Sequence, residues 1–101
     1  MEKDWKTFRK MVPGLRERYI KEKNEEIRKI LTDKNKSETD RFWDAREKIE
    51  EERKILIDCL DGHSRSKMLY YILIMYSHEL LKEDDLKEFS DEVQNRMRKH
   101  M

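Results

Sequence analysis

The greatest variety of reactive side chains lies in one ten-residue segment, 58–67 (DCLDGHSRSK). A glycine followed by serines, an arginine and a lysine is typical of a helix start, where backbone N–H groups, hydroxyls and cations can bind an anion together. The candidate anion- or phosphate-binding residues are His63, Ser64, Arg65, Ser66 and Lys67. The simpler interpretation is that Ser64 only caps the helix, while the cations are solvated or pair with nearby aspartates.

The same segment contains a cysteine and a histidine four residues apart, which raises the question of catalysis. A nucleophile such as Cys59 or Ser64 with His63 as its base also needs an orienting acid and an oxyanion donor, and the sequence identifies neither. As metal ligands, Cys59, His63 and His78 lack the paired spacing of zinc sites. We therefore expect no catalytic residue, no metal and no cofactor, and we expect Cys59 to be a small core residue.

Basic residues alternate with aromatic ones near the start of the chain. Residues 1–36 carry 12 Lys and Arg against 7 Asp and Glu, with Trp5, Phe8 and Tyr19 among them. This mixture is used by nucleic-acid-binding proteins for phosphate contacts and base stacking. The candidate contacts are Lys6, Arg9, Lys10, Arg16 and Arg18. However, glutamates are mixed into the same stretch and the whole chain has a net charge of only +1, so nucleic-acid binding is the alternative function rather than the favoured one.

The composition predicts an all-α protein with a single helical domain over residues 1–101. The chain has two Gly and one Pro and no period-two pattern typical of a strand. Its single cysteine and the charged residues 1–12 predict a cytoplasmic protein without a secretory leader. The nine-residue apolar run 68–76 is shorter than the roughly 20 residues needed to cross a membrane. The bias toward Lys, Glu and Ile is typical of an AT-rich prokaryotic or phage source.

Cap and breaker residues predict where the helices begin and end. Pro13 is expected to break the first helical stretch. Ser37 followed by Asp40 predicts a capping box, and Gly62 predicts a left-handed C-terminal cap. Four to five helices are expected, at about 4–11, 13–32, 38–61, 64–82 and 83–99.

The short turn at 33–36 predicts that the helices on either side form a long antiparallel hairpin. Folding the chain about residue 35 places Ile27 near Trp43 and Ile20 near Ile49, so we expect apolar residues to pack across the hairpin. The basic helix would also lie beside an acidic one, since residues 37–62 carry 5 Lys and Arg against 9 Asp and Glu. Charge and hydrophobic register therefore agree.

The apolar run 68–76 predicts association with a second copy. Its apolar residues occupy every face of a helix, a pattern found in a central helix or in one shared between two chains. Only 36% of the residues are hydrophobic, and a chain this small buries a limited share of its surface, which favours completing the core by association. The predicted dimer interface consists of Met68, Tyr71, Ile72, Met75, Leu86, Phe89 and Val93. The favoured function is a small non-enzymatic interaction or regulatory protein, a homodimer that binds another protein.

Overall fold

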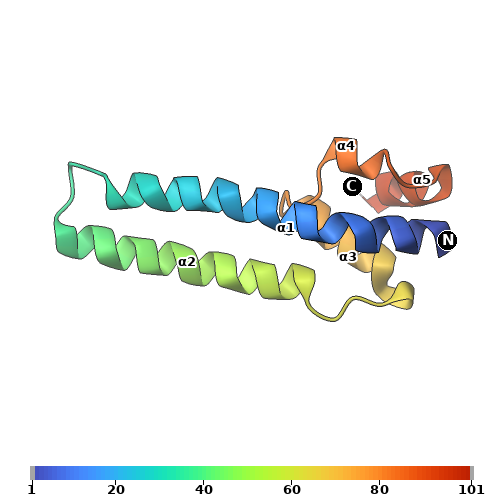
Figure 1. Cartoon of the computed structure of the whole chain (residues 1–101), viewed down its shortest axis with the longest axis horizontal. Helices are drawn as coiled ribbons and strands as arrows, with labels where there is room; N and C mark the ends of the chain where they lie inside the picture. The colour runs from blue at the N-terminus through green and yellow to red at the C-terminus, as the bar shows by residue number, and fades with distance from the viewer. Residues whose placement is uncertain (1, 101) are drawn as a thin grey trace.

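The computed structural model describes residues 2–100, which form an elongated, all-helical molecule of 52 × 23 × 23 Å (Figure 1). Within those residues the α-helices are α1 (Glu2–Leu31), α2 (Glu38–Leu60), α3 (Met68–Ser77), α4 (Glu83–Leu86) and α5 (Asp91–His100). A 3-10 helix, η1 (Arg65–Lys67), precedes α3. The predicted all-α fold built on a long antiparallel helical hairpin is confirmed.

The first helix is continuous through Pro13, so the predicted break before residue 13 is wrong. A proline inside a helix removes one hydrogen bond and clashes with the preceding turn, at a cost of about 3 kcal/mol. Val12 and Leu15, on either side of Pro13, are both buried in the core, and Pro13 itself is exposed. Burial of the neighbouring apolar side chains outweighs the local cost of the proline.

The left-handed turn predicted at the end of α2 is present, and of the predicted capping box at its start the hydrogen bond to the Ser37 side chain is present. The backbone N–H of Asp40 donates to the Ser37 hydroxyl oxygen at 3.1 Å. At the other end, Gly62 has φ +81°, the left-handed conformation that favours glycine. The Tyr71 hydroxyl donates to the Asp61 carbonyl at 2.7 Å and so anchors this turn to α3.

The helices after the hairpin are shorter than predicted. The expected helix at 64–82 consists of η1 and α3, and α3 ends at Ser77. Glu79 then adopts φ 65°, and the N–H groups of Leu80 and Leu81 both donate to the Met75 carbonyl, at 2.9 and 3.1 Å. This turn buries both leucines, which a continuing straight helix would not do.

The expected last helix at 83–99 is divided into α4 and α5. Ser90 lies between them, and its hydroxyl oxygen accepts the Val93 N–H at 3.3 Å. The Ser90 N–H and hydroxyl both donate to the buried Asp4 carboxylate at 2.8 Å. The contact with α1 thus fixes the start of α5, which the sequence pattern around residue 90 did not show.

The hydrophobic core occupies one end of the molecule. We call residues 2–19 and 51–100 the head, and residues 20–50, which form the outer part of the hairpin, the arm. In Figure 1 the arm extends away from α3, α4 and α5. The core cluster of buried apolar side chains lies entirely in the head, whereas Ala45 is the one buried apolar residue among the described residues of the arm.

The seven residues predicted to form the dimer interface are buried within the single chain, so the interface prediction is wrong. Their exposed fractions do not exceed 8%. These core residues are Met68, Tyr71, Ile72, Met75, Leu86, Phe89 and Val93. One side of the apolar helix α3 is covered by other parts of its own chain, because most of the apolar residues lie in the head and pack there, whereas Tyr70 of α3 is 59% exposed. The arm is left without a core of its own.

Candidate interaction surface

At the boundary between head and arm, the two helices of the hairpin meet through a ring of polar side chains. The Tyr19 hydroxyl donates to the Glu52 carboxylate, and Lys48 lies 3.4 Å from the other oxygen of Glu52. Lys48 also lies 3.0 Å from Glu26, which pairs with Lys23 at 3.0 Å. The Lys23 ammonium is 4.9 Å from the centre of the Tyr19 ring and closes the ring of contacts. The hairpin is therefore joined here by charges and hydrogen bonds.

The pKa shifts in this ring follow from its contacts. Hydrogen bonds from Lys23 and Lys48 lower the pKa of the Glu26 carboxyl. The hydrogen bond with Glu26 raises the pKa of Lys48, although partial burial acts in the opposite direction. Burial, followed by the hydrogen bond to Glu52, raises the pKa of the Tyr19 hydroxyl. At neutral pH the ring therefore keeps Glu26 and Lys48 charged and Tyr19 protonated.

Because polar residues occupy this contact, the apolar residues expected there lie outside it. Trp43 is 56% exposed and Ile49 is 51% exposed. The expected packing of Ile27 on Trp43 and of Ile20 on Ile49 is therefore corrected. The predicted pairing of residues along the two helices was nearly right. Ile20 was expected near Ile49, and Tyr19, one residue before Ile20, donates to Glu52. The error was the assignment of the inward-facing residues.

Except for Trp43, the displaced apolar residues lie on one side of the hairpin, together with Leu31, Phe42 and Leu56. Each follows by one position a residue that lies toward the contact between the two helices. In an antiparallel helix pair, residues offset in this way lie on the same side of both helices. We call this surface the open face. Its apolar residues are Ile20, Ile27 and Leu31 on α1 and Phe42, Ile49 and Leu56 on α2.

Arginines lie among these apolar residues. Arg46 is placed between Phe42 and Ile49 along one side of α2, and Arg53 follows Ile49 by one helical turn. Arg53 pairs with Glu50 at 2.8 Å, and the Arg46 guanidinium is 5.9 Å from the centre of the Trp43 ring.

On α1, Arg16 precedes Ile20 by one turn. Between residues 2 and 100, no ion pair involves either Arg16 or Arg46. The open face therefore combines apolar side chains with guanidinium groups.

On the side of α1 away from the open face, Arg18 holds α4 and the turn before it. Its guanidinium donates to Asp85 at 2.6 and 3.3 Å and to the Leu80 carbonyl at 2.8 Å. Burial tends to raise the pKa of Asp85, but the hydrogen bonds from Arg18 and from the Lys82 N–H lower it on balance. Arg18 is thus a structural residue, and its prediction as a phosphate contact is corrected.

The other four residues of the predicted nucleic-acid surface are exposed along the head portion of α1. They are Lys6, Arg9, Lys10 and Arg16. The Arg9 guanidinium lies 5.9 Å from the centre of the Trp5 ring, and Arg65 lies 5.8 Å from the same centre. The structure thus places Arg9 and Arg65, taken from two different predicted sites, on one aromatic ring.

Most side chains of the predicted anion-binding segment contact other residues of the chain. Arg65 forms a two-point ion pair with Glu2, at 2.9 and 3.0 Å, which lowers the pKa of Glu2. The hydroxyl oxygens of Ser64 and Ser66 lie 3.3 Å apart, and Lys67 is exposed. The Ser64 side chain makes no capping hydrogen bond with the helix that follows, so the simple cap expected there is wrong, and anion binding by this segment stays a prediction.

His63 is a packing residue in this structure. Its Nε2 donates to the Cys59 carbonyl at 2.7 Å, and its ring lies edge-on to Phe8 and Tyr71, with ring centres 4.9 and 4.6 Å away. The Cys59 side chain is fully buried, and burial, followed by the charge of Asp58, raises its thiol pKa to about 11. The expectation that Cys59 is a small core residue is confirmed.

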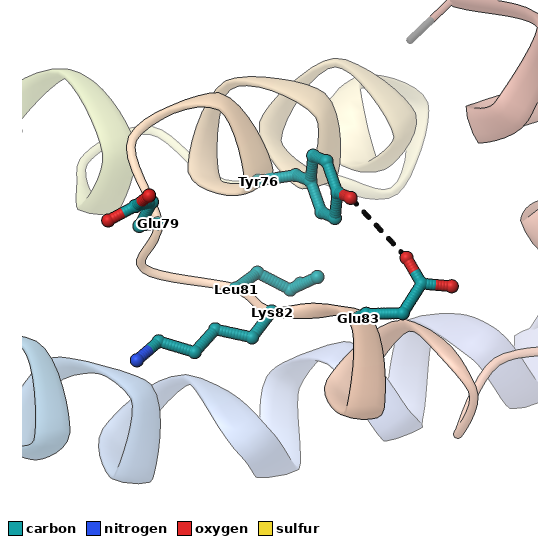
Figure 2. A pocket seen from close by; sticks show the side chains of 5 residues that line it. All are labelled: Tyr76, Glu79, Leu81, Lys82 and Glu83. Atoms are coloured by element: carbon teal, nitrogen blue, oxygen red, sulfur yellow. Dashed lines mark hydrogen bonds between the residues drawn. The ribbon is translucent and has the colours of Figure 1, made fainter.

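Three of the side chains that line the hollow in Figure 2, of about 380 Å³, have structural partners. The Tyr76 hydroxyl donates to Glu83 at 3.3 Å, and Arg98 also pairs with Glu83. Lys82 pairs with Glu22 on α1 at 2.7 Å. Across the part of the chain that the structure covers, no group of three or more His, Cys, Asp or Glu side chains is arranged to hold a metal. No helix there is long and apolar enough to span a membrane.

The open face is the strongest candidate site, and sequence reasoning did not identify it. Phe42, Ile49 and Leu56 are spaced by seven residues, the repeat typical of a helix that packs on a neighbour. That spacing was present but was not used, and of these three residues only Ile49 was expected in the contact within the hairpin. Comparisons with protein-family models, curated proteins and solved structures find no match to this chain.

Proposed function

We propose that this is a non-enzymatic interaction protein that binds another protein through the open face of its hairpin. The observation that carries the proposal is the exposure of large apolar side chains at helical spacing, with Phe42 61% and Ile49 51% exposed. Burying an apolar side chain of this size contributes about 1.5 to 3 kcal/mol. A partner that covers the open face would gain this free energy of burial, which the chain alone does not gain.

The contacts that the reactive side chains make within the chain favour a binding role over a catalytic one. The Cys59 thiol is buried and His63 donates to a backbone carbonyl, so the two do not form a nucleophile and base. Arg65 is paired with Glu2. These groups stabilise the head, whereas the exposed side chains Leu31, Phe42 and Ile49 of the open face lie outside the hydrophobic core.

The charge of the arm supports a protein partner over nucleic acid. Residues 20–50 contain nine Lys and Arg and nine Asp and Glu. A neutral arm does not provide the bulk attraction on which non-specific nucleic-acid binding depends. Aliphatic residues such as Ile27 and Ile49 also need an apolar partner surface rather than phosphate.

The proposal is tested by comparing wild type with two double variants. Phe42→Gln with Ile49→Gln removes apolar area from the open face, and Glu47→Gln with Lys54→Gln is the control at exposed polar positions of the same helix. Each tagged protein is used for affinity capture from cells of the source organism, followed by quantitative mass spectrometry. A partner retained by wild type and control but lost by the open-face variant is expected, and purified partner should repeat the difference. The same captured set for all three proteins would contradict the proposal.

A further inference from the structure

At the positions that define the two stripes of the open face the charged side chains all carry the same sign, and the Glu50 carboxylate that pairs with Arg53 lies beside them. The ten positions that define its two stripes are Arg16, Ile20, Asn24, Ile27 and Leu31 on α1 and Phe42, Arg46, Ile49, Arg53 and Leu56 on α2. Three are arginines and none is a carboxylate. We infer that the open face binds an acidic amphipathic helix of a partner protein, an inference that rests on the proposed function and specifies its partner.

The shape of the open face suits a helix. Its two stripes of side chains, one on each helix of the hairpin, run side by side, and a third helix can pack along the line between them. The stripe from Phe42 to Leu56 spans 14 residues, or about 21 Å at 1.5 Å per residue. A partner helix of about four turns would cover it, placing an apolar stripe against residues such as Ile27 and Ile49.

The arginines select the charge of that helix. Arg46 and Arg53 are two turns apart on α2, and Arg16 lies on the neighbouring helix. Glutamates or aspartates along the edges of a bound helix would accept two-point hydrogen bonds from the guanidinium groups. Both side chains of the pair between Arg53 and Glu50 are exposed to solvent. Replacing Glu50 by a carboxylate of the partner therefore costs little free energy.

A second copy of the chain fits this surface less well. An identical open face would bring arginines against arginines and would supply no carboxylate from its own ten positions. Like charges placed together across an interface oppose association. Nucleic acid would meet the arginines but would leave Phe42, Ile49 and Leu31 without apolar cover.

Labelled peptides of about 20 residues test the inference directly. A helix of this length spans the stripe from Phe42 to Leu56. One peptide has leucines at helical spacing flanked by glutamates, a second has lysines in place of the glutamates, and a third is a scrambled form of the first. Fluorescence anisotropy should show that the glutamate peptide binds at least tenfold more tightly than either of the others. Equal or tighter binding of the lysine peptide, or equal binding of the scrambled peptide, would overturn the inference.

Charge reversal provides the matched control. Arg16→Glu with Arg46→Glu and Arg53→Glu should reverse the preference toward the lysine peptide. Lys10→Glu with Lys21→Glu and Lys54→Glu changes the net charge by the same amount at exposed positions outside the two stripes and should leave the preference unchanged. The inference is wrong if both triple variants, shown to be folded by circular dichroism, shift the preference equally.

The same samples distinguish the two other candidates for binding to the open face, a second copy of the chain and nucleic acid. Light scattering that reports twice the 12.6 kDa chain mass, returning to one chain with Phe42→Gln and Ile49→Gln, would assign the face to a second copy and overturn the inference. Tighter binding of a single-stranded oligonucleotide than of the glutamate peptide would overturn it in favour of nucleic acid. If capture of a natural partner depends on the open face but the peptides show no charge preference, the proposed function stands and only its acidic partner is rejected.

Discussion

Tyr19 donates a hydrogen bond to the buried carboxylate of Glu52, joining α1 to α2 at the boundary between head and arm. Glu52 is 8% exposed and also contacts Lys48. A buried carboxylate is costly unless it is paired, so rotation or sliding of either helix would take the Tyr19 donor away from Glu52 and leave it only Lys48 of its own helix. This polar contact therefore sets the register of the hairpin and turns the apolar residues of the arm outward.

We predict that Tyr19→Phe lowers the free energy of unfolding by about 1 to 3 kcal/mol, because the Glu52 carboxylate loses a buried hydrogen-bond donor. Urea denaturation followed by circular dichroism measures this change. The matched control is Tyr70→Phe, since Tyr70 is 59% exposed, and its effect should stay within about 0.5 kcal/mol. Equal effects of the two variants would show that the hydroxyl of Tyr19 does not stabilise the hairpin.

We predict that Asp85→Asn destabilises the chain at neutral pH by about 1 to 3 kcal/mol, because the carboxylate that accepts from Arg18 is lost. The pKa of Asp85 lies below its usual value of 3.8 in the folded chain, so its contribution is complete above that pH and is lost as the pH falls below it. The stability difference between wild type and variant should shrink between pH 5 and about pH 2.

The control for this pH dependence is Asp84→Asn, because the Asp84 side chain is 97% exposed. Its unfolding curves should follow those of wild type at every pH. A difference between wild type and Asp85→Asn that stays constant from pH 5 downward would contradict the role assigned to the ion pair.

We predict opposite effects of alanine at the two glycines. Gly62→Ala should destabilise by about 1 to 3 kcal/mol, because φ +81° strains any residue with a Cβ and the new atom would lie 2.9 Å from the Tyr71 hydroxyl oxygen. Gly14→Ala has open space around its Cβ and lies inside α1, so it should stabilise by about 0.5 to 1 kcal/mol. Thermal unfolding checks both, and a shift of the same sign in both variants would refute the assignment.

We predict that the thiol of Cys59 reacts with an aromatic disulfide reagent about 100-fold more slowly in the native chain than in urea. Burial shields the sulfur and, together with the nearby charge of Asp58, raises its pKa from 9.0 to about 11, which reduces the thiolate about 100-fold near pH 8. Stopped-flow absorbance measures both rates on the same protein. Comparable native and unfolded rates would reopen the possibility that Cys59 is a nucleophile.

The sequence alone determined the features that depend on neighbours along the chain. Helix-favouring composition predicted the all-α fold, the turn at 33–36 predicted the antiparallel hairpin, and Ser37 and Gly62 marked the ends of α2. Each of these follows from local backbone preference or from hydrogen bonds between residues a few positions apart.

The tertiary structure decided which helix faces find cover. Periodicity shows which residues share a side of a helix, but it does not show which side meets a partner. Burial of Val12 and Leu15 carried α1 through Pro13, and the turn that buries Leu80 and Leu81 ended α3 early. Most buried apolar residues lie in the head, where long-range packing gains most, and so Ile49, which the sequence had placed inside the hairpin, was left on the open face with Phe42.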